Sequence, residues 1–281
     1  MPDPLIWDVR ASRYVTEDQL VAALANARYR LLGEVHDNPA HHALRARLIS
    51  ELAARGARPA VVMEQFDLDR DDALRAAQAS GRDAEGLADA GRLDRKGWQW
   101  PMHKPILEAA VTAGLPVRAA NLSRDLLRAD VQSLAEGDTA RWSARFHAAR
   151  WTEAQAAELR EDIAASHCGK VPDAIVPRLV LAQRLRDAAM AQALVDAETA
   201  DGAILIAGDG HVRADLGVPV YLHAPGLPGA AARSISVGLL EATAEDRRRP
   251  DFPRGLVGDN PGFDYLGFTP PAPREDPCAA M

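Results

Sequence analysis

The sequence between residues 29 and 42 reads YRLLGEVHDNPAHH and joins a mostly apolar run to a cluster of polar side chains. Its first part, Tyr29 to Glu34, has the length and character of a β-strand. A helical pattern follows from about Ala40 to Arg55, with leucine and isoleucine on one face, and Gly56 is placed to end it. A strand followed by an amphipathic helix is the first half of a βαβ unit.

The same alternation of short β-type runs and helical patterns continues along the chain. A second strand is expected at residues 59–64, which are continuously apolar up to Met63, as expected of a strand buried on both faces. From residue 123 to about 200 the pattern predicts long amphipathic helices instead. We therefore predict an α/β fold, with a mainly parallel central sheet flanked by helices and a helical lobe of about residues 123–200 inserted between strands. Further strands are expected at 117–120, 203–207, 218–222 and 235–240.

A length of 281 residues fits one large domain, because domains average roughly 100–200 residues. We expect a single α/β domain over residues 1–245. Residues 246–281 are rich in proline and glycine, and we expect a C-terminal tail that packs on the domain through the apolar cluster at 263–268.

Composition excludes several classes of function. With 40 acidic and 33 basic residues the net charge is −7, so nucleic acid is not an expected partner. No apolar run approaches the roughly 18–20 residues of a membrane span, and charged residues interrupt any signal sequence near Met1, so as the sequence stands we expect a cytoplasmic protein. Cys168 and Cys278 form no CxxC pair, so we expect neither a disulfide framework nor a cysteine zinc site.

Polar side chains follow three of the predicted strands, in the segments 33–38, 64–65 and 208–213. In open α/β sheets the ligand crevice lies outside the carboxyl ends of the strands, so these segments are expected to converge. Two imidazoles and two carboxylates there could bind a transition metal, or a carboxylate could act as a general base on a bound water. The candidate metal-binding and catalytic residues are Glu34, His36, Glu64 and His211.

Each of these residues also has a purely structural explanation, as a hydrogen-bonded loop histidine or a buried salt-bridge partner. The repetition of Gly-x-x-His, at Gly33 to His36 and at Gly208 to His211, favours a functional role. The second turn lacks the glycine pattern of dinucleotide sites and of phosphate loops, and the chain has neither a G-x-S-x-G elbow nor an H-E-x-x-H helix. Of the adjacent His41 and His42, at most one is expected to face the crevice, since neighbours on a helix point about 100° apart.

An aromatic segment, Gly97 to Pro105, contains Trp98, Trp100 and His103. It could be a hydrophobic plug over the end of the sheet. Alternatively, it could form a flat apolar wall with a coordinating side chain, as a planar macrocycle requires.

Several linked motifs resemble the ChaN-type haem-binding uptake proteins of the Tiki/TraB superfamily, which also includes erythromycin-esterase-like hydrolases. The resemblance runs from about Tyr29 to Tyr221 and includes a closing motif at 264–270. It rests on the segments 32–42, 62–64, 119–122, 183–191 and 207–213.

The resemblance implies an α/β fold with a helical lobe, and haem binding linked to iron uptake or handling. In hydrolytic relatives the paired Gly-x-x-His motifs and nearby glutamates form the reactive site. The resemblance implies that the corresponding residues here are Glu34, His36, Glu64 and His211. Relatives often carry a tyrosine where His103 stands, and they are commonly exported lipoproteins. We expect the haem-binding residues to be His103, Trp98, Trp100 and Arg213, the last toward the propionates.

Three hypotheses follow: a haem-binding protein, a hydrolase that uses Glu and His with or without a divalent metal, and a protein-interaction module. A homodimer that shares haem between subunits is compatible with the first.

Overall fold

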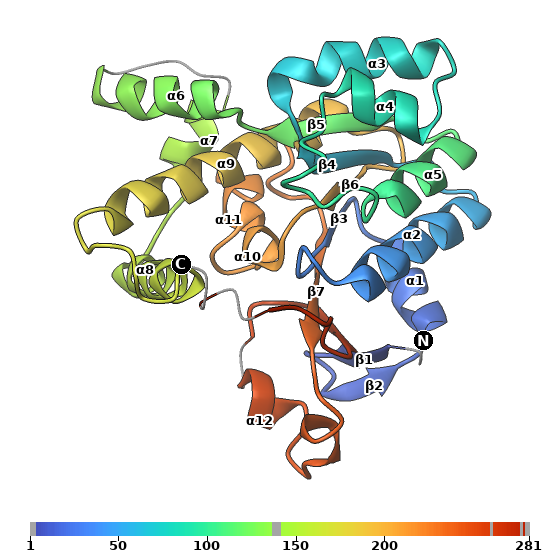
Figure 1. Ribbon diagram of the computed structural model, residues 1–281, viewed down its shortest axis with the longest axis vertical. Helices are drawn as coiled ribbons and strands as arrows, with labels where there is room; N and C mark the ends of the chain where they lie inside the picture. The colour runs from blue at the N-terminus through green and yellow to red at the C-terminus, as the bar shows by residue number, and fades with distance from the viewer. Residues whose placement is uncertain (1–3, 137–141, 259–260, 276–277, 279–281) are drawn as a thin grey trace.

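The computed structural model describes residues 4–136, 142–258, 261–275 and 278, and its centre is one eight-stranded sheet (Figure 1). The strand order is β2-β1-β8-β7-β3-β6-β4-β5. The six strands from β8 to β5 run parallel, and the β1–β2 hairpin adds two antiparallel strands at one edge. The predicted α/β class with a mainly parallel sheet is confirmed. The strands are β1 (Leu5–Asp8), β2 (Arg13–Val15), β3 (Tyr29–Leu32), β4 (Ala60–Asp67), β5 (Val117–Asn121), β6 (Ala203–Ile206), β7 (Ser234–Glu241) and β8 (Tyr265–Thr269).

Helices cover both faces of the sheet (Figure 1). The α-helices are α1 (Glu17–Ala25), α2 (Pro39–Ala54), α3 (Asp71–Ala79), α4 (Ala84–Ala90), α5 (Lys104–Thr112), α6 (Arg124–Glu136), α7 (Ser143–Ala148), α8 (Glu153–Ser166), α9 (Val176–Ala197), α10 (Asp209–Val212), α11 (Val218–Leu222) and α12 (Arg254–Val257). Two short 3-10 helices lie at Leu68–Arg70 and Asp246–Arg248.

Neighbouring residues of the central strands enter different cores because side chains alternate along a strand. Leu32 of β3 belongs to the core that α2 and α5 cover, whereas Leu31 packs toward α9 and α11. All four residues of β3 and all four of β6 are buried. β6 has the continuous apolar sequence expected of a parallel strand that is covered on both faces, whereas β3 is interrupted by Arg30, whose buried guanidinium donates to the carbonyl oxygens of Leu24 and Asp201.

The helical lobe predicted between strands is present as α6 to α9, between β5 and β6. The predicted strand at 218–222 is wrong, because these residues form α11. Pro219 occupies the first turn of this helix, where its missing N–H costs no hydrogen bond, whereas within a central strand it would remove one. Tyr221 and Leu222 are then buried against α9.

The ends of the chain contribute more to the sheet than the sequence indicated. The apolar cluster expected to anchor a tail forms β8, which pairs with β7 in parallel and with β1 antiparallel. Strands β1 and β2 were not expected.

A disulfide links Cys168, after α8, to Cys278, with the two Cα atoms 5.6 Å apart. This corrects the expectation of no disulfide, since two cysteines 110 residues apart give no local sign of pairing. None of the helices in the described ranges is long and apolar enough to cross a membrane.

Candidate functional site

The two Gly-x-x-His turns lie side by side, because β3 and β6 are neighbours in the sheet. The amide of Asp209 donates to the carbonyl oxygen of Glu34 at 3.0 Å. A Cβ on Gly33 would overlap the Asp209 carboxylate, and a Cβ on Gly208 would lie 3.0 Å from the ring of His36. Each glycine therefore leaves room for a side chain of the other motif, which brings the two segments together as the sequence predicted.

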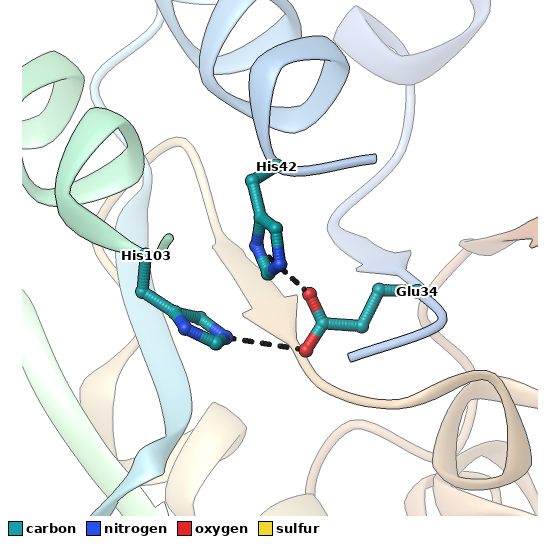
Figure 2. Close-up of side chains that lie close together, drawn as sticks. All are labelled: Glu34, His42 and His103. Carbon is teal, nitrogen blue, oxygen red and sulfur yellow. Dashed lines mark hydrogen bonds and ion pairs between the residues drawn. The ribbon is translucent and has the colours of Figure 1, made fainter. Parts of the chain in front are cut away.

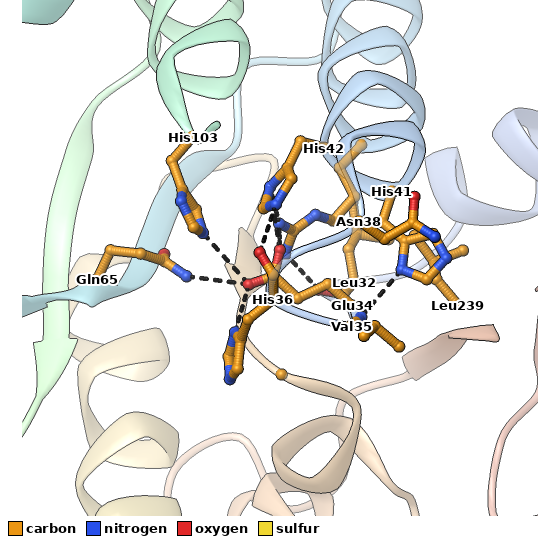
Figure 3. Close-up of polar contacts among 12 residues, drawn as sticks. Leu32, Glu34, Val35, His36, Asn38, His41, His42, Gln65, His103 and Leu239 are labelled. Carbon is orange, nitrogen blue, oxygen red and sulfur yellow. Dashed lines mark hydrogen bonds and ion pairs between the residues drawn. The ribbon is translucent and has the colours of Figure 1, made fainter. Parts of the chain in front are cut away.

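Glu34 is the centre of the first polar cluster (Figure 3). Its side chain is fully buried. Nδ1 of His36 lies 2.8 Å from Oε1, and Nε2 of His103 lies 3.2 Å from the same oxygen. Oε2 faces Nδ1 of His42 at 3.1 Å and forms an ion pair with Arg45. Four side chains, from the turn after β3, from α2 and from the segment before α5, thus meet at the carboxylate of Glu34.

Burial keeps two of these histidines uncharged at neutral pH. It lowers the pKa of His42 to about 4 and the pKa of His103 to about 2. Burial also lowers the pKa of Arg45, to about 9, so its guanidinium remains charged at neutral pH opposite Glu34.

His211 is the centre of the second cluster. Its Nδ1 donates to Asp187 Oδ1 at 2.6 Å, and its Nε2 lies 3.3 Å from Glu64 Oε1. Burial opposes a charge here, but the two carboxylates overcome it and raise the pKa of His211 to about 10. Burial also opposes the charge of Glu64, yet the imidazolium and the amide of Gly208 lower the pKa of this carboxyl to about 2. This cluster is a closed ion-pair network.

A groove of about 400 Å³ lies over the strand ends. On the lobe side, Leu159, Ile163 and Leu216 provide an apolar wall. The side chain of His36 is 50% exposed there. His211 lines the groove with only 10% of its side chain exposed.

Trp98 and Trp100 lie at different distances from the groove. Trp98 packs edge-on against the rings of His36 and His103, with centroids 5.1 and 5.6 Å away. Trp100 instead contacts Arg95 and Glu85 and packs on the α2 side of the sheet.

The other two expected haem-binding side chains are held by internal contacts. His103 is fully buried, with Nδ1 3.2 Å from the Trp98 carbonyl oxygen and Nε2 on Glu34. Arg213 lines the groove and is paired with three carboxylates. Its partners are Glu158, Asp162 and Asp215.

The four residues predicted to bind a metal together are divided between the two clusters, with Glu34 and His36 in one and Glu64 and His211 in the other. Within the described residues, a compact group of three metal-binding side chains occurs at Glu34, His42 and His103 (Figure 2).

Sequence reasoning missed the roles of Arg45 and Asp187, and it placed Gln65 at a strand end without choosing it as a candidate site residue. Arg45 follows His42 by one helical turn, and a buried arginine on the same helix face as a strand-end histidine is a signal that could have been used. His42, and not His41, reaches Glu34. His41 accepts from the amide of Val35 at 2.9 Å instead.

Comparison with known proteins identifies a family. The family model described as "Haem-binding uptake, Tiki superfamily, ChaN" matches residues 20–222. No curated protein matches the sequence. The chain belongs to this haem-binding uptake family.

Among solved structures, the chain is similar to ChaN of Campylobacter jejuni, described with cofacial haem binding. The identity is 20%, the match covers 94% of this chain and 96% of that one, and the TM-score is 0.73. At this identity the likeness shows a shared fold. The type III effector HopBA1 also matches, over 91% of this chain and 94% of its own, but with 12% identity and a TM-score of 0.47 it carries no argument.

Proposed function

We propose that this member of the haem-binding uptake family binds haem in the groove over the strand ends, with His36 as the axial ligand. The observation that carries this proposal is the environment of His36. Its Nδ1 is held by a buried carboxylate, and half of its side chain is exposed to the groove. Because a carboxylate only accepts, Nδ1 carries the proton and Nε2 presents a lone pair.

The residues around the groove fit haem. A histidine is a common axial ligand of haem iron, and ligating histidines regularly donate their second nitrogen to a carboxylate. Leu159, Ile163 and Leu216 line one side of the groove with apolar side chains that are mostly buried. In the proposed complex haem is the cargo, and it supplies the iron that His36 binds.

The chain's own residues then have separate roles. Glu34 orients the ring of His36 and is itself fixed by Arg45. The apolar side chains of the lobe exclude water from the porphyrin face. Arg213 lies on the groove, but its three carboxylate partners leave it little capacity for a propionate. We therefore expect the propionates to point to solvent.

Titration of the purified protein with haemin tests this proposal. Wild-type protein should give a saturable Soret shift, and His36→Ala should weaken haem binding by about tenfold or more, equivalent to about 1.4 kcal/mol. His147→Ala is the matched control, because this histidine lies in α7 and does not line the groove. Equal haem affinity of His36→Ala and wild type would overturn the assignment.

His103 is the alternative ligand that the resemblance implies. To bind iron, His103 would have to give up its contact with either the Trp98 carbonyl or Glu34. Its side chain is fully buried, so it would also have to move to reach the groove. We therefore expect His103→Ala to retain a histidine-type Soret spectrum. Loss of that spectrum in His103→Ala, with His36→Ala unchanged, would instead favour His103.

We do not propose the hydrolase, because neither the family match nor the similar solved structure supports it and the second cluster offers no free base. Both nitrogens of His211 are engaged by carboxylates, and Glu64 is engaged by His211 and Gly208. The homodimer stays a prediction, which the mass in solution with and without haem checks.

The Cys168–Cys278 disulfide supports a working compartment that is oxidising, because cytosolic thiols are usually kept reduced. This differs from the cytoplasmic location expected from the sequence. Thiol titration of protein isolated from its native cells, with thiols blocked at lysis, should find no free cysteine. Two free thiols per chain would support the cytoplasm.

A further inference from the structure

Three buried side chains that could bind a metal point toward one another at Glu34 (Figure 2). Glu34 lies in the turn after β3, His42 in the first turn of α2, and His103 is the N-cap residue of α5. One ligand atom from each lies within 4.8 Å of the others, and all three residues are buried. Three separate elements therefore direct nitrogen and oxygen donors at one point.

The hydrogen bonds around the two histidines limit which ring nitrogens carry lone pairs. Nδ1 of His42 accepts from Arg45, so its Nε2 carries the proton and donates to the carbonyl oxygen of His36 at 2.9 Å. His103 faces an acceptor at each nitrogen, the Trp98 carbonyl at Nδ1 and Glu34 at Nε2, both at 3.2 Å, and a neutral ring donates to only one of them. In the tautomer with the proton on Nδ1, Nε2 of His103 presents a lone pair to Glu34, as Nδ1 of His42 does at 3.1 Å.

Two acceptors that face each other at this distance repel unless a cation lies beside them. Arg45 supplies this cation at the contact between His42 and Glu34. Its Nη2 lies 2.9 Å from His42 Nδ1 and pairs with Glu34 Oε2. Over the described residues, no comparable donor reaches Nε2 of His103. The buried Oε1 of Gln65, next to Glu34, also has no hydrogen-bond partner.

We propose that Glu34, His42 and His103 bind a divalent transition-metal ion, with zinc as the reference case, separately from the haem groove. Two histidines and a glutamate are a known zinc donor set. The 3.1 and 3.2 Å contacts are made by different oxygens of Glu34, and one ligand atom from each residue lies within 4.8 Å of the others. The three donors would therefore move closer together to reach the roughly 3.3 Å between ligands of a tetrahedral ion with bonds of about 2.0–2.1 Å. The second nitrogen of each histidine already has the carbonyl partner that metal-ligating histidines usually have. On binding, Arg45 withdraws from His42 and keeps its pairing with Glu34.

Metal titration of haem-free protein tests the site. Full-length wild-type chain, stripped with a chelator, is titrated with Co²⁺ and then with Zn²⁺ in competition. We expect one equivalent of Co²⁺ with the intense visible absorption of a four-coordinate ion, displaced by Zn²⁺. His42→Ala and His103→Ala should each weaken binding by about tenfold or more, whereas His147→Ala should not. No stoichiometric binding, or equal binding by all variants, would overturn the proposal.

Because loss of a buried histidine can prevent folding, the wild-type protein also gives a direct test. In crystals soaked with Zn²⁺, an anomalous difference peak is expected among Glu34, His42 and His103. A peak only in the groove near His36 and His211, or no peak, would overturn the site. Neither experiment involves haem, so failure of haem binding would leave the metal result intact, and the reverse also holds.

Discussion

His36 and His211 occupy the same place in the same motif but have opposite surroundings. Each is the last residue of a Gly-x-x-His turn that follows a buried strand. His36 has one partner at Nδ1 and a half-exposed ring, whereas His211 is buried with a carboxylate at each nitrogen. The first arrangement leaves a nitrogen for a ligand, and the second uses both for stability. The motif therefore specifies the position of an imidazole and leaves its role to the neighbours.

The largest expected difference between the two histidines is in stability. His211→Ala leaves Glu64 and Asp187 buried with little compensation, so the free energy of unfolding should fall by about 3–5 kcal/mol. His36→Ala should cost below about 1 kcal/mol, because Glu34 keeps Arg45 and the lost side chain is half exposed. Urea denaturation of both variants checks this. Similar losses would remove the distinction between them.

The ion pairs of the second cluster should make the stability of the protein depend on pH. The pKa of His211 is raised from 6.5 to about 10, so its contribution is complete below pH 6.5 and is lost as the pH rises through 10. The pKa of Glu64 is lowered from 4.5 to about 2, so its contribution is complete above pH 4.5 and is lost as the pH falls through 2.

Both contributions are therefore complete between pH 4.5 and 6.5. The melting temperature of wild type, followed from pH 5 to 10, should decline on the alkaline side. His211→Gln should start lower and decline less. An alkaline decline as steep as that of wild type would show that the charge of His211 does not cause it.

A smaller effect is expected where the two motifs touch. Gly208→Ala places a Cβ 3.0 Å from the ring of His36, and the exposed ring can yield by a few tenths of an ångström. Haem affinity should fall severalfold, with stability changed by about 1 kcal/mol or less. Gly210→Ala is the matched control, because the nearest atom to its Cβ is Gln183 Nε2 at 3.8 Å. Parallel haemin titrations should separate the two variants, and equal affinities would argue against His36 as the ligand.

The smallest effect is expected at Arg213. Its partners Glu158 and Asp162 are about half exposed, so Arg213→Ala should cost about 1 kcal/mol or less. Haem affinity should change less than about threefold, equivalent to roughly 0.6 kcal/mol. Calorimetric unfolding and haemin titration measure both quantities. A tenfold loss of haem affinity would restore Arg213 as the propionate partner.

Much of the central fold could be predicted because the signals are local. The strand at β3, the helix α2 and the lobe between β5 and β6 follow from hydrophobic periodicity and from residues that end helices. Strand β8 could not be assigned in this way, since a five-residue strand in a proline-rich segment depends on pairing with β1 and β7. The segment at 218–222 has an apolar composition that suits a strand, but in the structure it packs against α9 as a helix.

The candidate site divides in the same way. The sequence by itself determined which polar residues follow the strands and that glycines precede both histidines, because strand ends and turns are set by neighbouring residues. Only the tertiary structure decided that Arg45 and His42 reach Glu34, and that Asp187 from α9 reaches His211. Hydrogen bonds, burial and pKa depend on which atoms lie within a few ångströms, and those atoms come from distant parts of the chain. For that reason two identical motifs became one half-exposed imidazole and one buried ion pair.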